Sequence, residues 1–264
     1  MINNISFPGL GIDITVNRAA FTIGGFPIYW YGIIIACGLL IGAIYGFKEC
    51  AKTGVNADDF LNMLIIAIPV SIICARLYFV IFSPDLFRDD FSAVFDIRSG
   101  GLAVYGGIIG AAAVIFLYCR KKKINMGKIL DILAVGLLIG QALGRWGNFV
   151  NGEAFGSVTI LPWGMTIKSD GVLIAESVHP TFLYESLWNL VGLAIILIYK
   201  KNRTFFGELM CIYLMWYGTG RAVIEGLRTD SLYFGPFRVS QLLSLILVIV
   251  GLVVFVVNKI KKTE

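Results

Sequence analysis

The chain has little charge. Asp, Glu, Lys and Arg make up 15% of its 264 residues, whereas a typical soluble domain carries about a quarter. Hydrophobic residues make up 58%, and the mean hydropathy is +0.82. This composition excludes an ordinary soluble domain and predicts an integral membrane protein. The net charge of +5 does not indicate a nucleic-acid partner, because basic loops are the usual orientation signal of membrane proteins.

Histidine and paired cysteines are also scarce. His179 is the single histidine, which excludes a metal site built from several histidines. The five cysteines lie in or beside apolar stretches without C-x-x-C spacing, so we interpret them as small buried hydrophobes. We expect no metal and no cofactor. Residues 1–27 lack a basic segment leading to a small-residue cleavage site, so we expect no cleavable signal peptide.

Long apolar runs are abundant. A membrane-spanning helix needs about 20 apolar residues, and seven segments approach this length. They are residues 28–47, 60–82, 101–119, 129–145, 182–199, 207–224 and 239–257. We therefore predict an all-α integral membrane protein with seven transmembrane helices in one domain, residues 1–264.

Lys and Arg residues predict the orientation. With the N-terminus outside, the inner loops and tail hold 13 of them and the outer segments hold 6. The outer ones are Arg18, Arg88, Arg98, Lys168, Arg228 and Arg238. Basic residues favour the cytoplasmic side, so we predict an extracytoplasmic N-terminus and a cytoplasmic C-terminus. The inner basic runs are then topology signals and lipid-headgroup anchors.

The longest connection, residues 147–181, lies outside in this topology. Asp170-Gly171 separates two short segments of strand-forming residues, which predicts a β-hairpin. We expect a small extracytoplasmic cap inserted between the fourth and fifth spans. Glycines spaced by four, at positions 38, 42 and 46 and at 136, 140 and 144, predict close helix packing.

Three arginines, Arg76, Arg145 and Arg221, lie within apolar spans. Each lies 14 to 16 residues from the inner start of its span, or roughly 21–24 Å at 1.5 Å per residue. They are therefore expected at one depth in the outer leaflet. Other polar residues reach that level, namely Tyr31, Tyr105, Asn148, Asn151, Glu153, His179, Tyr184, Glu185, Glu225 and Arg228.

Simpler interpretations exist for single members of this set. Arg76 alone could extend to the headgroups, and Arg221 with Glu225 could be an ordinary i,i+4 pair. Three arginines at one depth exceed what anchoring requires, because a mid-membrane arginine costs from about 3 to above 10 kcal/mol. We predict a site for an anionic ligand. At this depth the natural anion is a lipid phosphate, which planar guanidinium groups bind well.

Six segments resemble the motifs of a known family, the prolipoprotein diacylglyceryl transferases. The strongest match is the ten-residue stretch Gly144-Arg145-Trp146-Gly147-Asn148-Phe149-Val150-Asn151-Gly152-Glu153. The others, in order, are residues 29–32, 75–80, 100–107 and 179–185, and 217–221 with Glu225 and Arg228. A bundle of seven spans with this orientation is also the family's topology.

The resemblance implies a reaction. The family transfers the diacylglyceryl group of phosphatidylglycerol to the lipobox cysteine of a prolipoprotein, forming a thioether and releasing glycerol-1-phosphate, in the bacterial cell membrane. It implies that Arg145 and Arg221 are the indispensable arginines. Around them the resemblance places Tyr31, Asn148, Glu153, Gly156, Tyr217 and Glu225. Together with the depth argument, we expect catalytic roles for Arg145, Arg221, Tyr105, Glu153 and Glu225. Substrate-binding roles are expected for Tyr31, Arg76, Asn148, Asn151, Gly156, His179, Tyr217 and Arg228.

Tyr105 is a departure from the family. Many members carry histidine there, a favoured base, whereas tyrosine with a reference pKa near 10 is a poor base at neutral pH. Tyr105 is then a hydrogen-bond donor to substrate. His179 is either the base or a structural residue of a His-Pro turn, and the base assignment stays open.

Two other functions compete with a transferase. One is a transporter or flippase for an anionic lipid or a small phosphate. Against it, the arginines are off-centre, and alternating access favours the midplane. The other is a receptor for secreted peptides without catalysis. The expected partners are phosphatidylglycerol, prolipoproteins with a lipobox and membrane lipids, with no nucleic acid.

Overall fold

A computed structural model describes residues 1–88, 90–97 and 100–263. Asp89, Arg98, Ser99 and Glu264 lie outside the described residues, and Arg98 is one of the outer basic residues counted above. The chain forms two compact units. The first comprises Met1–Gly46 and Leu130–Glu264, and the second comprises Phe47–Ile129.

Every predicted span coincides with an α-helix. The helices are α1 (Trp30–Thr53), α2 (Ala57–Phe82), α3 (Val104–Lys122), α4 (Met126–Asn151), α5 (Thr181–Tyr199), α6 (Glu208–Glu225) and α7 (Val239–Thr263). Within the described residues, six of them, all but α6, are long and apolar enough to cross a membrane. The chain is therefore a multi-pass membrane protein. The 18 residues of α6 include Glu208, Arg221 and Glu225, and its crossing of the bilayer stays a prediction.

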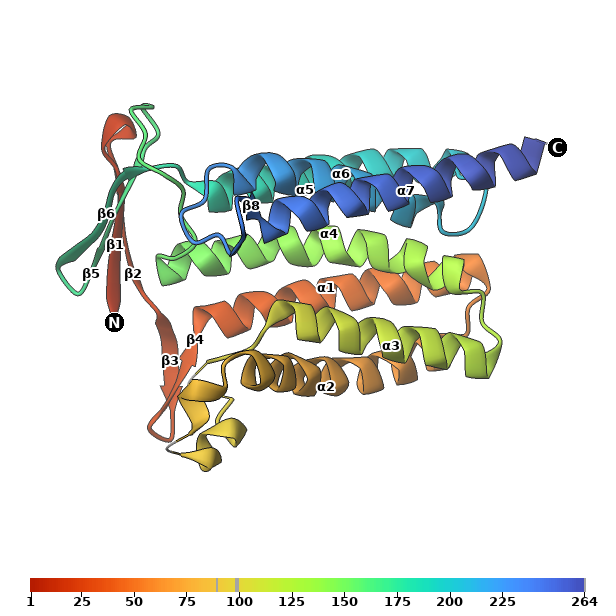
Figure 1. The fold of residues 1–264 in the computed structure, drawn as a ribbon, viewed down its shortest axis with the longest axis horizontal. Helices are drawn as coiled ribbons and strands as arrows, with labels where there is room; N and C mark the ends of the chain where they lie inside the picture. The colour runs from red at the N-terminus through yellow and green to blue at the C-terminus, as the bar shows by residue number, and fades with distance from the viewer. Residues whose placement is uncertain (89, 98–99, 264) are drawn as a thin grey trace. The chain divides into compact units, whose positions relative to one another are not determined.

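In the first unit, α5, α6 and α7 lie side by side (Figure 1). Leu138 of α4, Ile196 of α5 and Leu209 of α6 share one buried core. The glycine stripes bring α1 close to α4, as predicted. A Cβ on Gly38 would lie 3.3 Å from the Cα of Gly140, so two backbones meet there without intervening side chains.

Two buried carboxylates hold the start of α6. Asp131 of α4 accepts hydrogen bonds from the backbone N–H groups of Gly207 and Leu209, at 3.0 and 2.8 Å. Glu208 is fully buried and accepts from the Tyr199 hydroxyl at 2.6 Å and from Lys259 Nζ at 2.9 Å. Carboxylates near a helix N-terminus satisfy its free N–H groups and favour its dipole. These contacts fix where α6 begins. They therefore also fix the position along the helix axis of the residues at its C-terminal end.

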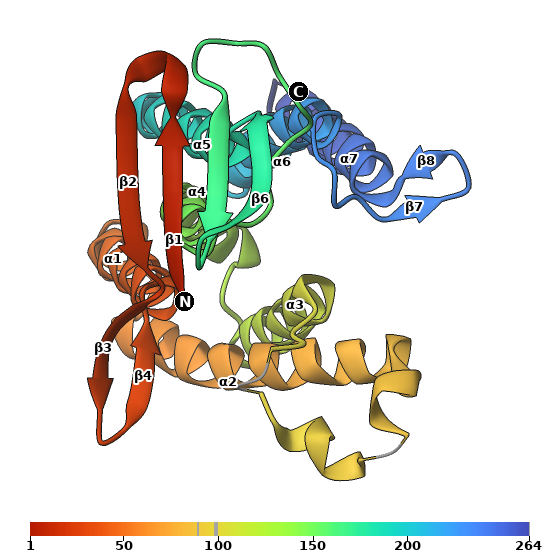
Figure 2. The same ribbon diagram turned by 90° about the vertical axis from the view of Figure 1, so that its left-hand side faces the viewer.

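A four-stranded antiparallel sheet in strand order β2-β1-β5-β6 lies beside the C-terminal end of α4 and the N-terminal end of α5 (Figure 2). Its strands are β1 (Ile2–Phe7), β2 (Ile12–Asn17), β5 (Met165–Ser169) and β6 (Val172–Val178). The predicted hairpin is confirmed, with Asp170 and Gly171 both at positive φ. Short hairpins also form from β3 (Ala19–Ile23) with β4 (Phe26–Tyr29) and from β7 (Tyr233–Phe234) with β8 (Phe237–Arg238).

Two expectations change here. The predicted helices form, but the sheet that contains the predicted hairpin also includes the N-terminal strands β1 and β2, which were not expected. The fourth span was predicted to end at Arg145, but α4 continues to Asn151, so the connection begins at Gly152. The helix continues because polar residues such as Asn148 do not end a helix by themselves; Gly152, with φ of 66°, does.

The second unit contains α2 and α3, which pack closely. Short 3-10 turns, Pro84–Phe87 and Phe91–Phe95, lie in their connection. Arg76 of α2 is buried, and its guanidinium donates to the backbone carbonyls of Ala93, Val94, Gly100 and Gly101 at 2.6 to 2.9 Å. Arg76 thus holds the connecting loop against α2.

Apolar side chains cover the outer surfaces of the helices. Ile65 and Ile73 of α2 are 58% and 55% exposed, and Leu245 and Val253 of α7 are 56% and 53% exposed. A soluble protein rarely exposes such continuous apolar faces. A bilayer is the solvent that fits them.

Candidate active site

The Glu185 carboxylate is the centre of a cluster of three arginines. Glu185 lies on the second turn of α5, and its side chain is 4% exposed. Its oxygens lie 2.5 Å from Arg145 Nη2, 2.9 Å from Arg221 Nη1 and 3.3 Å from Arg228 Nη1. We call these four residues the arginine cluster. Arg145 and Arg221, which the sequence predicts at one depth, thus share a carboxylate from a third helix.

The arginines come from the ends of two helices. Arg145 lies near the C-terminal end of α4, and Arg221 lies one turn before the end of α6. Arg228 follows α6 in a turn, where its N–H donates to the carbonyl of Glu225 at 3.2 Å. All three guanidinium groups are largely buried, with side chains 20%, 15% and 10% exposed.

Two tryptophans lock α5 to α6 beside the cluster. Trp188 and Trp216 stack with ring centroids 4.3 Å apart. Each indole N–H donates to the other residue's backbone carbonyl, at 3.0 and 2.9 Å. Gly192 and Gly220 lie against these rings, where a Cβ would collide with the indole. The tryptophan pair fixes the register of α5 against α6. It therefore also fixes the position of Glu185 on α5 relative to Arg221 on α6.

Two more carboxylates balance the buried charge. Glu225 Oε2 lies 2.5 Å from Arg221 Nη2, which is the i,i+4 contact expected from the sequence. Asp230 accepts from Arg228 Nε at 2.9 Å and from Nη2 at 2.6 Å, a bidentate pair. Burial alone would raise the pKa of Asp230, but the hydrogen bonds and charge of Arg228 lower it below its usual value. Asp230 is therefore ionised at neutral pH.

An amide network extends from the cluster along the end of α4. Arg145 Nη1 donates to Asn148 Oδ1 at 3.2 Å, and Asn148 Nδ2 donates to Glu153 Oε1 at 3.0 Å. Asn151 Nδ2 donates to the same Glu153 oxygen at 3.2 Å. The structure thus joins four residues of the predicted site. In this arrangement Glu153 orients Asn148, which orients the guanidinium of Arg145.

Tyr31 packs on α4 at the glycine next to this network. The Cβ that any other residue would carry at position 147 would lie 2.6 Å from Tyr31 Cδ2. Gly147 therefore lets the ring of Tyr31 approach the backbone between Arg145 and Asn148. Tyr31, a predicted site residue, is placed beside the network by this contact.

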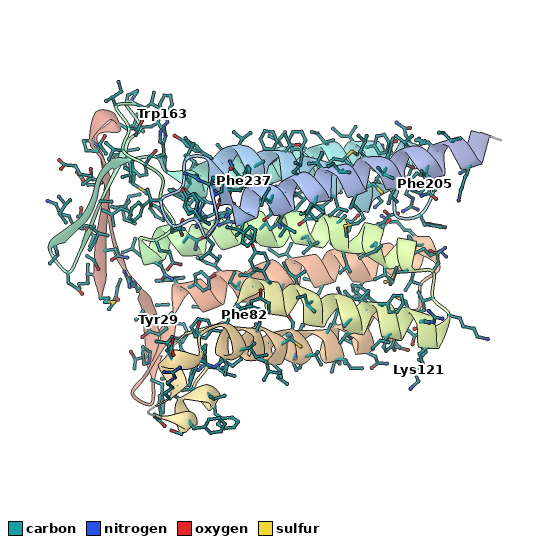
Figure 3. The ribbon with its side chains drawn as sticks, viewed as in Figure 1. Tyr29, Phe82, Lys121, Trp163, Phe205 and Phe237 are labelled. Carbon is teal, nitrogen blue, oxygen red and sulfur yellow. The ribbon has the colours of Figure 1, made fainter. Side chains whose placement is uncertain are left out.

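His179 and Gly156 meet where the cap joins α5. The Gly156 N–H donates to the carbonyl of His179 at 2.9 Å, and a Cβ at Gly156 would lie 2.7 Å from the His179 Cβ. His179 Nδ1 lies 3.2 Å from the hydroxyl of Tyr184, which accepts from the Trp163 indole N–H at 2.7 Å (Trp163 is labelled in Figure 3). These contacts favour the structural interpretation of His179, and glycine is required at position 156 by close approach.

Three predicted residues have other surroundings. Tyr217 lies one turn before Arg221 on α6 and stacks on Tyr213, with centroids 5.6 Å apart. Arg76 and Tyr105 belong to the second unit. Their predicted common depth with the arginine cluster stays a prediction. The backbone carbonyls bound to Arg76 are partners that the sequence did not indicate.

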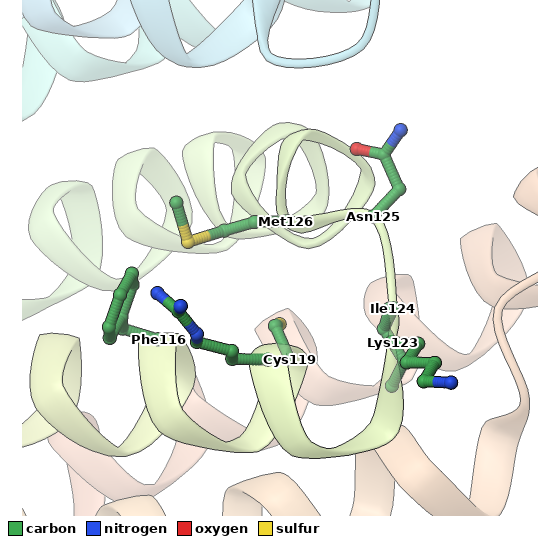
Figure 4. Close-up of a pocket in the computed structure, with 7 residues that line it drawn as sticks. Phe116, Cys119, Lys123, Ile124, Asn125 and Met126 are labelled. Atoms are coloured by element: carbon green, nitrogen blue, oxygen red, sulfur yellow. The ribbon is translucent and has the colours of Figure 1, made fainter.

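An open pocket of about 450 Å³ lies at the turn from α3 to α4 in the second unit (Figure 4). Arg120, Lys123 and Asn125 line it together with apolar side chains. It contains no predicted site residue. In the part of the chain that the structure describes, no three His, Cys, Asp or Glu residues are grouped so as to hold a metal ion.

Glu185 was expected at the level of the site but was given no catalytic or binding role. Its motif and its level at the outer start of α5 were visible in the sequence, but its central position was not. One signal was available: a carboxylate in an apolar span needs a cationic partner, and the arginines expected at that level provide three. A sequence alone does not show that one carboxylate serves all of them.

The profile of the prolipoprotein diacylglyceryl transferase family matches residues 18–257. A phosphatidylglycerol–prolipoprotein diacylglyceryl transferase of Clostridioides difficile is 46% identical over 91% of this chain and 95% of its own length. Proteins of the same name from Finegoldia magna and Bacillus cereus are 44% and 40% identical over 90% and 95% of this chain, and over 94% and 95% of their own lengths. The resemblance inferred from the motifs is confirmed, and the chain belongs to the prolipoprotein diacylglyceryl transferase family.

Proposed function

We propose that this chain transfers the diacylglyceryl group of phosphatidylglycerol to the thiol of the lipobox cysteine in prolipoproteins. The observation that carries the proposal is the arginine cluster, three buried guanidinium groups on one carboxylate at the ends of apolar helices. The relatives of this chain described above carry the name of this activity. The reaction is the first step of bacterial lipoprotein maturation.

The reaction places growing negative charge on a phosphate. The cysteine sulfur attacks the glycerol carbon that carries the phosphate ester, a C–S bond forms, and the C–O bond to the phosphate breaks. Glycerol-1-phosphate leaves with the bonding electrons, and the thiol proton passes to a base. Fixed guanidinium groups in a water-poor site stabilise such charge without having to reorganise. Arg145 and Arg221 take this role.

The other residues of the site orient these two arginines or the substrates. Glu225 and Glu153 position Arg221 and Arg145 through the contacts described above. Substrate contacts are assigned to Tyr31, Asn148, Asn151, Tyr217 and Arg228, with Tyr105 as a hydrogen-bond donor. Arg76, Gly156 and His179, also expected from the sequence to bind substrate, support the surrounding backbone through the contacts described above. A free cysteine has a pKa near 8.5, and a nearby guanidinium group favours the thiolate.

The site faces the extracytoplasmic side of the cell membrane in this proposal. The excess of Lys and Arg in the inner loops supports that orientation. It also supports an extracytoplasmic cap, a cytoplasmic C-terminus and seven spans including α6. Prolipoproteins emerge on that side, and the phosphates of outer-leaflet phosphatidylglycerol lie at the level predicted for the arginines.

Reconstitution tests the function. Purified protein in vesicles containing phosphatidylglycerol is mixed with a lipobox peptide, and the products are identified by mass spectrometry. We expect a peptide with a thioether-linked diacylglyceryl group and an equal amount of glycerol-1-phosphate. Lipid movement between leaflets without either product would favour a flippase. Peptide binding with neither product nor lipid movement would favour a receptor.

Gly147→Ala is expected to slow transfer by about tenfold, because its Cβ would push the Tyr31 ring out of place. Gly140→Ala on the same helix is the matched control, since a Cβ there has nothing within 4 Å. The initial rate of product formation measures both. Equal rates for the two variants would show that the position of the Tyr31 ring does not matter.

A further inference from the structure

A buried asparagine on β1 holds the end of α4. The inward-facing residues of β1 are Asn3, Ile5 and Phe7, and all three are buried. The alternation of the strand predicts an apolar side chain at position 3, because this position faces the core. Asn3 instead has a polar amide side chain there, and the residue is 0% exposed. Its Nδ2 donates to the carbonyl of Val150 at 2.7 Å. A buried amide is costly unless hydrogen-bonded, and this one is bonded to the last turn of α4.

The carbonyl that Asn3 reaches is one that the helix leaves free. The Gly152 N–H donates to the carbonyl of Phe149 at 3.0 Å, and the Glu153 N–H donates to the carbonyl of Asn148 at 3.1 Å. This pair of bonds, with Gly152 at φ 66°, is a Schellman cap. The carbonyl of Val150 takes no part in either bond, and Asn3 satisfies it.

The same cap carries two residues of the proposed site. Asn148 and Glu153 are joined by its backbone bond and again by their side chains. Gly152, which turns the chain between them, also fits against Asn3: a Cβ on Gly152 would lie 3.2 Å from Asn3 Nδ2. Any movement of this cap therefore moves the carboxylate and amide that orient Arg145.

We propose that Asn3 is a positioning residue of the transferase site, which acts by fixing the C-terminal cap of α4. The inference rests on the proposed function for its effect on activity. Asn3 lies outside the segment that the family profile matches, because that segment begins at residue 18. The N-terminal strand is thus part of the support of the site, in addition to a strand of the cap.

The test variant is Asn3→Leu. Leucine has a similar size and suits the buried position, but it lacks the Nδ2 donor that binds the carbonyl of Val150. Asn4→Leu on the same strand is the matched control, because Asn4 is half-buried on the opposite face of β1 and its amide bonds to Thr15 Oγ1 at 3.2 Å instead of to α4. Hydrogen exchange of the Glu153 amide reports the cap, and steady-state transfer reports the site. For Asn3→Leu we expect faster exchange at Glu153 and a fall in kcat of about tenfold, with KM changed by less than about twofold. Asn4→Leu should change neither.

A double variant separates positioning from general destabilisation. In a Glu153→Gln background, Asn3→Leu should lower kcat by much less than it does in the wild type, because the residue it acts through is already impaired. Equal fold losses in both backgrounds, or unchanged exchange at Glu153, would overturn the proposal. If Asn3→Leu fails to fold, Asn3→Asp, which keeps the side-chain shape and loses the amide donor, is measured instead. If the wild type itself forms no product, the proposed function fails. The exchange measurement still decides whether the hydrogen bond from Asn3 to Val150 stabilises the cap of α4.

Discussion

Arg221→Lys is expected to lower kcat by about 10²–10³-fold while leaving a folded membrane protein. Lysine keeps the positive charge but loses the planar fork that binds a carboxylate and a phosphate oxygen together. Arg221 uses Nη1 for Glu185 and Nη2 for Glu225, so one ammonium cannot occupy both positions. The magnitude follows from the loss of one fixed donor at a site of developing negative charge. Arg145→Lys should behave similarly, and alanine at either position should abolish transfer.

Arg88→Lys is the control for this series. Its guanidinium pairs with Asp85 at 2.9 Å, and both side chains are exposed, so its rate should equal that of the wild type. Initial rates of thioether formation are measured for all variants at saturating phosphatidylglycerol. Turnover by Arg145→Lys and Arg221→Lys at the rate of the wild type would exclude recognition of the phosphate by guanidinium forks.

Glu185→Gln is expected to damage both the fold and the activity. The substitution leaves three buried arginines facing two carboxylates, Glu225 and Asp230. Removing one partner of a buried ion pair costs about 3–5 kcal/mol, because an uncompensated charge remains in a low-dielectric site. The unfolding temperature should fall, and transfer should fall by at least about tenfold as the guanidinium groups separate.

Glu176→Gln on β6 provides the matched control, since Glu176 is exposed. Unfolding in detergent and transfer in vesicles are measured for both variants. A Glu185→Gln protein with unchanged unfolding temperature and turnover would show that the shared carboxylate does not organise the arginines.

The helices were predictable because a bilayer requires every backbone polar group to be satisfied within the segment. Hydropathy therefore located all seven helices. It misplaced the end of α4, where Asn148 and Asn151 lie within the helix and the Schellman cap at Gly152 ends it. The hydropathy signal stops at the last apolar run, while the backbone geometry continues to the next glycine.

The N-terminal part of the cap sheet was not predicted. The hairpin at Asp170-Gly171 is local, and its turn residues indicated it. The pairing of β1 with β5 joins Asn3 to Ser169, residues far apart in the chain. No local pattern reveals such a partner. Asn3 itself, an amide among inward-facing apolar residues, becomes informative only when Val150 is seen beside it.

The site could be predicted in part. Arg145, Arg221 and their polar neighbours were identified by their cost in an apolar span, and the motifs identified the family. The central place of Glu185 could not be predicted, because it depends on three helix ends meeting. Arg76 was grouped with the other arginines by depth, whereas the structure shows its guanidinium bound to loop carbonyls.

The most direct test of the proposed function is an experimental structure of the protein with bound phosphatidylglycerol. The arginine cluster predicts that the lipid phosphate lies within hydrogen-bond distance of the guanidinium groups of Arg145 and Arg221, at the outer-leaflet level. A phosphate bound by other residues, with both guanidinium groups remote from it, would contradict the assignment of the arginine cluster as the active site.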